Sequence, residues 1–344
     1  MATVTPIGLD IGSMSIRAVE TARGKDGPVV TRAGMAPLPP GVVQGGTVHD
    51  AKPLTAELRR LWSTAKFRTR KVVLGVTNPQ TVVREMSVSN LPPRELRASL
   101  PFQVRDALPL PPDRSLLDFF PLEDPGGKET VRGLLIAAPK EAVVDMVRAV
   151  EDAGLHVARV DLASFALLRA VSRLDAQVEA IVDIGAGATS VVVHDDGVPL
   201  IVRTIPRGGA EVTQTVATRL GVDLAQAEDL KRRVGVRGDL EGGDAEAADV
   251  VREAVRPLIG EIRTSFAYLG SGSRPTRVAR VALSGGGALL PGLVESLHAQ
   301  LGIDVAFTDP AVRLRRGRRD KHDGLDRFRP AAAVSIGLAL GAAA

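Results

Sequence analysis

Residues 9–17 of the chain are Leu-Asp-Ile-Gly-Ser-Met-Ser-Ile-Arg, and residues 182–190 repeat the pattern as Val-Asp-Ile-Gly-Ala-Gly-Ala-Thr-Ser. Apolar, β-rich residues precede and follow both copies. Such a pattern predicts a strand, a tight glycine turn and a second strand. The sequence therefore predicts the same hairpin twice, near the start and near the middle of the chain.

The two turns have the composition of phosphate-binding loops. Glycine lets backbone N–H groups approach phosphate oxygens, hydroxyl groups add donors, and the carboxylates of Asp10 and Asp183 can hold a hydrated divalent cation. A single hairpin of this kind more often serves turn geometry alone. Two copies so far apart indicate duplication at the scale of a domain. We therefore expect an α/β protein with two related halves around a nucleotide cleft.

Two further motifs follow the second hairpin. Residues 281–288, Val-Ala-Leu-Ser-Gly-Gly-Gly-Ala, predict a strand that ends in glycines, where a purine or ribose can approach the backbone; a plain strand-to-helix turn is the alternative. Residues 227–231, Ala-Glu-Asp-Leu-Lys, lie in a predicted helix that Asp223 caps. Glu228 and Lys231 share a face of this helix. A surface ion pair is the alternative interpretation there.

In this order the motifs resemble those of the actin-like ATPase superfamily over nearly the whole chain. The resemblance implies ATP and Mg²⁺ as cofactors. The nucleotide-binding residues implied are Asp10, Gly12, Ser13, Met14, Ser15, Arg17, Asp183, Gly185, Gly187, Thr189, Glu228, Lys231, Gly285, Gly286 and Gly287, with Asp10 and Asp183 orienting Mg²⁺ through water. Arg17 stands where the superfamily usually has lysine, so we expect a phosphate contact of altered geometry. Asp161 is either a helix N-cap or the catalytic residue that orients the attacking water.

The region from residue 81 to residue 157 sets the chain apart within that superfamily. It contains Leu-Pro-Pro-Arg-Glu-Leu at 91–96, Leu-Pro-Leu-Pro at 108–111 and Asp-Phe-Phe at 118–120. With residues 8–13 and 290–293, these motifs closely resemble the PilM family of type IV pilus assembly proteins. The resemblance implies that the N-terminal cytoplasmic peptide of the membrane protein PilN docks in a groove between this insert and the first half. The sequence identifies no residue of that groove.

Hydrophobic periodicity gives the insert and its surroundings a domain plan. Strands are predicted at 72–76, 81–88, 116–120 and 131–137, and a helix at 141–153. We expect a first half at 1–80 plus 158–178, a small inserted α/β subdomain at 81–157, and a second half at 179–344. The second half includes a smaller subdomain at about 207–275. Residues 331–344 are uncharged and too short to span a bilayer, and their helical spacing predicts a closing helix packed on the second half.

Composition excludes several classes of function. The 344 residues include no cysteine, which rules out disulfides, thiolate catalysis and cysteine-ligated metals. Aromatic residues make up only 3%, too few for stacking platforms for single-stranded nucleic acid. The net charge is +4, and much of the basic excess lies at 313–322, which predicts a solvated loop or a contact with an anionic membrane surface. From the scarce aromatics and this charge distribution we expect no nucleic-acid partner. Met1 to Pro6 lacks the basic start of a signal peptide, so we expect a cytoplasmic location.

Three functions remain open on this reading. The favoured one is an ATP-binding adaptor of the type IV pilus platform, held at the inner face of the cell membrane through PilN, with slow or no ATP hydrolysis. Such an adaptor would also contact other platform and motor proteins and could self-associate. An FtsA-like division filament protein would need a charged amphipathic C-terminal helix, which is missing here. A small-molecule kinase would need an acid-base aspartate beside a substrate pocket, and none stands out.

Overall fold

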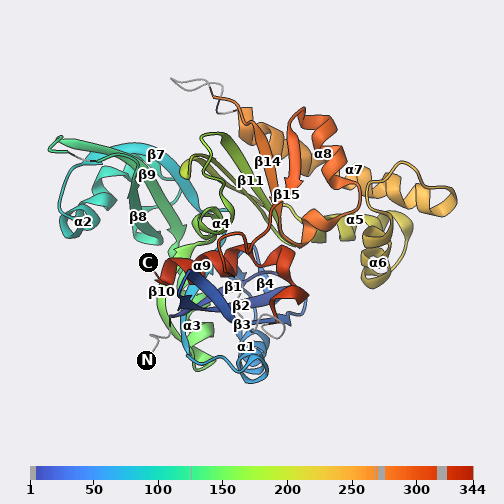
Figure 1. Ribbon diagram of the computed structural model, residues 1–344, viewed down its shortest axis with the longest axis horizontal. Coiled ribbons are helices and arrows are strands. Elements are labelled where there is room, and N and C mark those ends of the chain that lie inside the picture. Colours follow the sequence, from blue (N-terminus) through green and yellow to red (C-terminus); the bar gives the residue numbers. More distant parts are fainter. Residues whose placement is uncertain (1–4, 125, 268, 270–275, 316–323, 344) are drawn as a thin grey trace.

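Two five-stranded sheets of matching topology form the body of the molecule (Figure 1). The computed structural model describes residues 5–124, 126–267, 269, 276–315 and 324–343. The first sheet has the order β10-β6-β1-β2-β3, with β1 (Ile7–Ile11), β2 (Ser15–Gly24), β3 (Gly27–Pro37), β6 (Lys71–Val76) and β10 (His156–Leu162). The second has the order β13-β12-β11-β14-β15, with β11 (Val178–Ile184), β12 (Thr189–Asp195), β13 (Val198–Ile205), β14 (Arg280–Ser284) and β15 (Asp304–Phe307).

Corresponding strands pair in the same sense in both sheets. Each of the two central strands, β1 and β11, pairs antiparallel with its hairpin partner and parallel with the strand on its other side. Those parallel neighbours, β6 and β14, each pair parallel with the strand at the sheet edge. The predicted duplication into two related halves is therefore confirmed.

Helices cover the outer face of each sheet. On the first sheet these are α1 (Ala51–Ala65) and α3 (Lys140–Asp152), and the short hairpin of β4 (Val43–Gln44) and β5 (Thr47–Val48) lies beside them. α1 begins where the Asp50 side chain accepts a hydrogen bond from the backbone N–H of Lys52, and it buries Leu54, Leu58 and Leu61. A stripe at this spacing is the inner face of an amphipathic helix.

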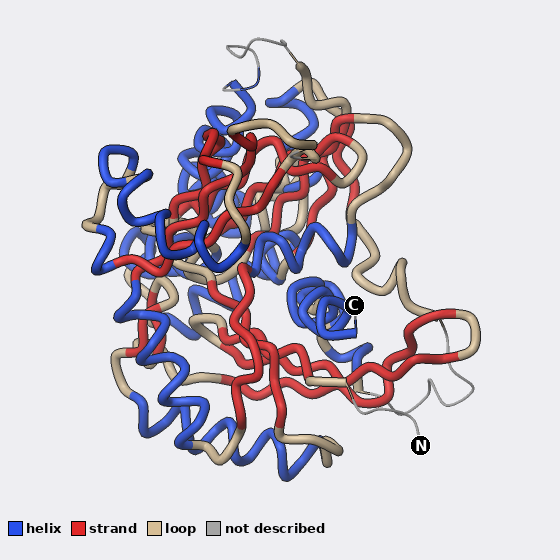
Figure 2. The backbone as a smooth tube through the Cα atoms, turned by 90° about the vertical axis from the view of Figure 1, so that its left-hand side faces the viewer, coloured by secondary structure: helices blue, strands red, loops and turns tan. Residues whose placement is uncertain are grey.

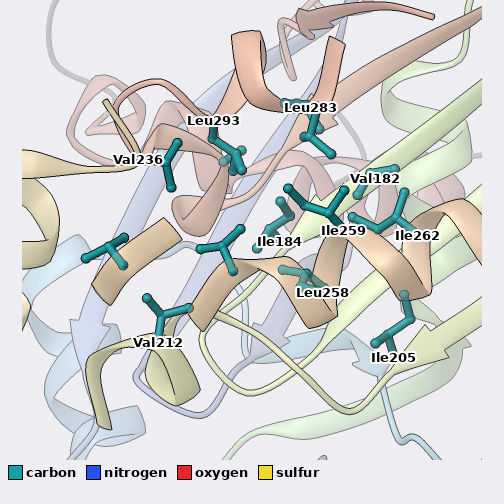
Figure 3. Packing of buried hydrophobic residues seen from close by; sticks show 14 of the residues in the cluster. Val182, Ile184, Ile205, Val212, Val236, Leu258, Ile259, Ile262, Leu283 and Leu293 are labelled. Carbon is teal, nitrogen blue, oxygen red and sulfur yellow. The ribbon is translucent and has the colours of Figure 1, made fainter. Parts of the chain in front are cut away.

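The second sheet has a larger helical cover. It consists of α5 (Gly209–Leu220), α6 (Leu224–Val234), α7 (Gly242–Ala267) and α8 (Leu293–Leu301). Figure 3 shows the resulting core, in which Leu258 and Ile259 of α7 pack near Ile184 of β11. Asp223 caps α6 through a capping box with Gln226, as the sequence predicts. This core supports the second hairpin from behind.

Two helices fill the space between the sheets, and each one crosses to the opposite half. α4 (Ala163–Val171) follows β10 of the first sheet yet packs on β11 and β12 of the second. α9 (Ala333–Ala343) belongs to the end of the chain, and it packs on β1, β2 and β6 of the first sheet (Figure 2). The prediction that the closing helix packs on the second half is therefore wrong. Its residues are apolar around the whole helix, and such a pattern predicts burial without specifying the sheet.

Close backbone approach fixes the position of α9. A Cβ atom added to Gly8 of β1 would collide with the carbonyl oxygen of Ser335, and one added to Gly337 would collide with the carbonyl oxygen of Ala166 in α4. Glycine is required where two backbones come this close. Among the described residues, no helix is both long and apolar enough to cross a membrane.

The inserted subdomain is a three-stranded antiparallel sheet with one helix. Its strands are β7 (Val82–Ser89), β8 (Ser115–Pro121) and β9 (Thr130–Pro139), in the order β7-β9-β8. α2 (Pro93–Gln103) and two 3₁₀ turns, at Arg105–Ala107 and Pro112–Arg114, lie between β7 and β8. α2 packs against the sheet through Leu100, which joins Val104 in a small core.

The predicted range of the insert, 81–157, includes residues that pack elsewhere. α3 contributes Met146, Ala149 and Val150 to the core of the first half, together with Leu54 and Leu58 of α1. The strand β10 begins at His156 and pairs with β6 of the first sheet. By its packing, the insert thus ends near Pro139. The hydrophobic periodicity of residues 141–153 predicts the helix α3. It does not indicate which sheet the buried side of that helix packs on.

Candidate nucleotide site

The two Asp-Ile-Gly hairpins have the same backbone geometry. In the first, the N–H of Gly12 donates to the carbonyl of Ser15 at 2.9 Å, and in the second the N–H of Gly185 donates to the carbonyl of Ala188 at 2.9 Å. Asp10 lies opposite Arg17 in its ladder, and Asp183 lies opposite Ser190 in the other. Each turn is therefore closed by one equivalent hydrogen bond, with its aspartate at an equivalent position.

The hairpins meet tip to tip across the molecule. A Cβ atom on Gly187 would collide with the hydroxyl of Ser13, and the charge of Asp10 acts on Asp183 strongly enough to shift its pKa. Gly187 therefore owes its lack of a side chain to the close approach of the opposing loop. The structure brings the two turns together, as the expectation of a shared cleft requires.

The charges at this meeting point favour a cation. Burial raises the pKa of Asp183, the charge of Asp10 raises it further, and the Ser284 hydroxyl and Arg17 act in the opposite direction. The Asp10 carboxylate accepts a hydrogen bond from Arg17 at 2.7 Å. Among the described residues, no group of three or more His, Cys, Asp or Glu side chains can surround a metal ion. Mg²⁺ at this place would take its remaining ligands from water and phosphate oxygens, the ligands it usually keeps in nucleotide sites.

The Arg17 guanidinium has a nitrogen that forms no hydrogen bond with a described residue. A Cβ atom on Gly12 would lie 3.9 Å from both terminal nitrogens of Arg17, so the guanidinium lies along the first turn. Its Nε atom is buried and lacks a hydrogen-bond partner among the described residues. Because a planar fork can bind a carboxylate and a phosphate at once, arginine fits here in place of an ammonium group.

Glu228 and Lys231 form a partly buried cluster behind the second hairpin. The Lys231 ammonium donates to Glu228 at 2.6 Å, to the Thr213 hydroxyl at 2.8 Å and to the Gly209 carbonyl at 3.0 Å. The N–H of Gly209 in turn donates to the carbonyl of Gly185 at 2.9 Å. The pair is thus no isolated surface contact, because its hydrogen bonds link α6 to the phosphate turn.

The pKa values of this pair follow from burial and from the hydrogen bonds. Burial would raise the pKa of Glu228, but hydrogen bonds from Lys231, Thr213 and Arg232 outweigh it and lower that pKa to about 2. Burial lowers the pKa of Lys231, and Glu228 counteracts this effect. The pair is therefore held in its charged form at neutral pH.

The three glycines at 285–287 have different roles. Gly285 adopts a φ of +88°, its N–H donates to the carbonyl of Pro330 at 3.0 Å, and a Cβ there would collide with the backbone of Ile184. A Cβ on Gly287 would lie 2.5 Å from the Ile184 side chain, whereas one on Gly286 would meet open space. Two of the glycines thus serve close packing on β11, and Gly286 is the one with free space beside it.

Two of the predicted residues, Thr189 and Asp161, make structural contacts with their side chains. Thr189 pairs with Ile184 at the position that Ile16 holds in the first hairpin, and its buried hydroxyl donates to the carbonyl of Arg207 at 2.8 Å. Asp161 forms an ion pair with Arg169 of α4, which also donates to the carbonyl of Gly337 in α9. The N-cap of α4 is Leu162 without a side-chain hydrogen bond, so Asp161 does not cap that helix.

Met14 and Ser15 lie in the first turn, where Met14 is 42% exposed and the two residues use their backbone carbonyls. Residues 316–322 of the predicted basic run lie outside the described residues. Arg313, just before them, donates to the carbonyl and hydroxyl of Ser172.

Sequence reasoning missed Gly209, Thr213 and Ser284. Gly209 and Thr213 hold Lys231 in place, and Ser284 lies opposite Asp183 in the parallel pairing of β11 with β14. The Gly-Gly pair before α5 and the serine before the glycine triplet were the available signals. Both gain meaning only when the strand order is known.

Comparison with known proteins gives the fold a family context. The sequence profile of the family described as "Type IV pilus assembly protein PilM" matches residues 8–343. The chain is similar to a solved PilM-PilN type IV pilus biogenesis complex, with 28% identity, 99% of each chain covered and a TM-score of 0.87. It is also similar to the cell division protein FtsA of Bacillus subtilis, with 22% identity over 88% of this chain and 78% of that protein.

A more distant structure has the same fold. MreB5 of Spiroplasma citri, solved with AMPPNP bound, is 13% identical, covers 89% of this chain and 92% of its own, and has a TM-score of 0.53. The expected actin-like ATPase fold, with its α/β insert in the first half, is therefore confirmed.

Proposed function

Because the chain belongs to the PilM family of type IV pilus assembly proteins, we propose that it is a cytoplasmic ATP-binding adaptor of the pilus assembly platform. In this role it binds the N-terminal peptide of PilN and is held at the inner face of the cell membrane through that partner. The observation that carries the nucleotide part is the meeting of two equivalent Asp-bearing turns, with Arg17 between them. The similarity to a solved PilM-PilN complex supports the peptide part.

The site residues divide by role. Asp10 and Asp183 would hold Mg²⁺ through water, and the backbone N–H groups of the two turns would bind the β- and γ-phosphates. Arg17 would contact a phosphate oxygen with its unused nitrogens. The adenosine would fit in the free space beside Gly286. Lys231 would be coupled to the bound nucleotide through the hydrogen bonds that lead from Lys231 to Gly185. Because two carboxylates repel each other, the divalent cation would stabilise the closed arrangement of the halves.

Calorimetry with Mg·ATP tests the nucleotide part. We expect binding by the wild-type chain, a rise in its melting temperature, and slow or no hydrolysis. Arg17→Gln should weaken binding by about tenfold or more, the loss of one charged hydrogen bond, whereas Arg17→Lys should lose less. Absence of both binding heat and thermal stabilisation in the wild-type chain would refute ATP binding.

The junction between the insert and the first half is the proposed peptide groove. Phe120 of β8 lies against Phe165 of α4 with ring centroids 5.5 Å apart, and it remains 44% exposed. β10, the edge strand that leads into α4, exposes Val160. An exposed strand edge can pair with an extended peptide, and the half-exposed aromatic pair offers an apolar contact for its side chains.

A pull-down with a synthetic N-terminal peptide of PilN tests the docking part. Phe120→Ala should reduce peptide capture by roughly tenfold, the worth of one partly buried aromatic contact. Phe307→Ala is the matched control, because Phe307 is a similarly exposed phenylalanine on β15 of the second half. Equal capture by both variants would show that the peptide binds elsewhere, and no capture by the wild-type chain would refute the adaptor role.

A further inference from the structure

The outer face of α2 and the turns that follow it carry an unusual combination of side chains. Phe102 is 78% exposed, the highest value among the exposed large apolar residues. Arg94 and Arg97 are exposed on α2, Arg105 is exposed in the 3₁₀ turn that continues the helix, and Arg114 is exposed in the 3₁₀ turn just before β8. We refer to these five residues as the α2 face.

The cations of this face have no partner among the residues that the structure describes. The guanidinium groups of its four arginines form no hydrogen bond or ion pair with another described residue, although many other arginines of the chain are paired. An unpaired cation keeps its full attraction for an external anion.

The apolar part of the face has the shape of a knob beside a shallow hollow. The Phe102 ring forms one wall of an open hollow of about 360 Å³, together with Pro101, Arg105, Pro112 and Asp113. Leu100 and Val104, on the opposite side of α2, already supply its contact with the insert sheet. The Phe102 ring therefore adds nothing to the core of the subdomain, and its exposure is unfavourable for the isolated chain.

We propose that the α2 face binds the anionic headgroup surface of a lipid bilayer directly. A bilayer accepts a protruding aromatic ring without a matching pocket, whereas a protein partner has to supply one. Four spread positive charges match a continuous anionic surface better than they match a single carboxylate. α2 lies at one end of the longest axis of the molecule (Figure 1). The inference rests on the proposed function for the presence of a membrane nearby.

Co-sedimentation with vesicles tests this contact on the full chain without nucleotide or peptide. The probe is vesicles of phosphatidylglycerol mixed with phosphatidylcholine, compared with vesicles of phosphatidylcholine alone. We expect salt-sensitive binding to the anionic vesicles only. The R94Q/R105Q variant should bind roughly 20- to 30-fold more weakly, and F102A about tenfold more weakly.

Matched controls separate this face from general charge. R256Q/R263Q removes two exposed arginines from α7 that pair with no described residue, and F307A removes an exposed phenylalanine from β15. Both controls should bind vesicles nearly as wild type, and F102A should still capture the PilN peptide and bind Mg·ATP. Failure of the proposed adaptor role would appear in those last assays and leave the vesicle result unaffected.

Three results would overturn the proposal. The first is wild-type protein that stays in the supernatant with anionic vesicles. The second is equal loss of binding in the two arginine pairs, which would assign the effect to net charge. The third is salt-sensitive larger assemblies of the chain alone that R94Q/R105Q abolishes without any vesicle binding, which would assign the face to a second copy.

Discussion

The crossing of α4 and α9 predicts opposite effects for the same substitution in two helices. Gly337 and Gly260 both lie inside helices, where alanine is favoured over glycine by roughly 1 kcal/mol. At Gly260 an added Cβ meets open space, so Gly260→Ala should stabilise the chain by about that amount. At Gly337 the added Cβ collides with the Ala166 carbonyl oxygen, and even the Ala166 Cα behind it would be only 2.9 Å away.

The obstacle at Gly337 is backbone, so no rotamer change relieves it. Nonbonded heavy atoms attract at roughly 3.5–4 Å, and α9 must therefore move away from α4. Overpacking of this kind costs about 1–3 kcal/mol, and a rigid backbone obstacle belongs at the upper end of that range. After the gain in helix propensity, Gly337→Ala should destabilise the chain by about 2 kcal/mol.

Urea denaturation of the two variants beside wild type measures the difference, which we expect to be about 3 kcal/mol in the free energy of unfolding, with unchanged slopes. Gly337→Ala should also weaken Mg·ATP binding, because the shifted helix separates the sheets that carry the two turns. Equal stabilisation by both variants would refute the crossing geometry.

Three further predictions concern the nucleotide site. Asp183→Asn should stabilise the ligand-free chain at neutral pH and abolish Mg²⁺-dependent ATP binding. Because the pKa of Asp183 is raised in the folded state, the stability of the wild-type chain falls as pH rises through that pKa. Melting curves of the variant across pH should lack this fall. Lys231→Met should cost about 1–3 kcal/mol in a thermal melt, and Glu228→Gln in the same chain should recover part of it. Since the pKa of Glu228 is lowered from 4.5 to about 2, its contribution to wild-type stability is present above pH 4.5 and lost as pH falls toward 2. The lysine variant should show a smaller acid loss, because Thr213 and Arg232 still donate to Glu228. Thr189→Val should lower the free energy of unfolding in urea by about 1–3 kcal/mol and leave the calorimetric affinity for Mg·ATP unchanged. A large loss of affinity with an unchanged free energy of unfolding would show that Thr189 binds phosphate.

Local pattern was sufficient to predict the two hairpins, the strands of the insert and the order of the motifs. Asp10 and Asp183 could be paired from sequence because the same residues recur in the same hairpin. Their contact with Arg17 was less visible, since it depends on the ladder register that places residue 17 opposite residue 10. The fold class was thus within reach of the sequence, and the contacts inside the site were only partly so.

Tertiary packing explains the predictions that were wrong. A helix such as α9, apolar on all sides, gives no direction for its neighbours, and the sheet it covers follows from a chain crossing that periodicity cannot encode. The phosphate role of Thr189 stays a prediction; its hydroxyl is buried and donates to the carbonyl of Arg207, and burial is not visible in the sequence.

The exchange of α4 and α9 makes the two halves mutually dependent in construction. The inner face of each sheet is covered by a helix that follows the other half in the chain. Neither half is therefore a complete folding unit. Such interlocking also restricts how the cleft can open: the halves can pivot about the helix pair, but they cannot draw straight apart without uncovering both inner faces. A nucleotide bound between the turns would therefore rotate one half relative to the other about the helix pair. A partner that contacts both halves would respond to that rotation.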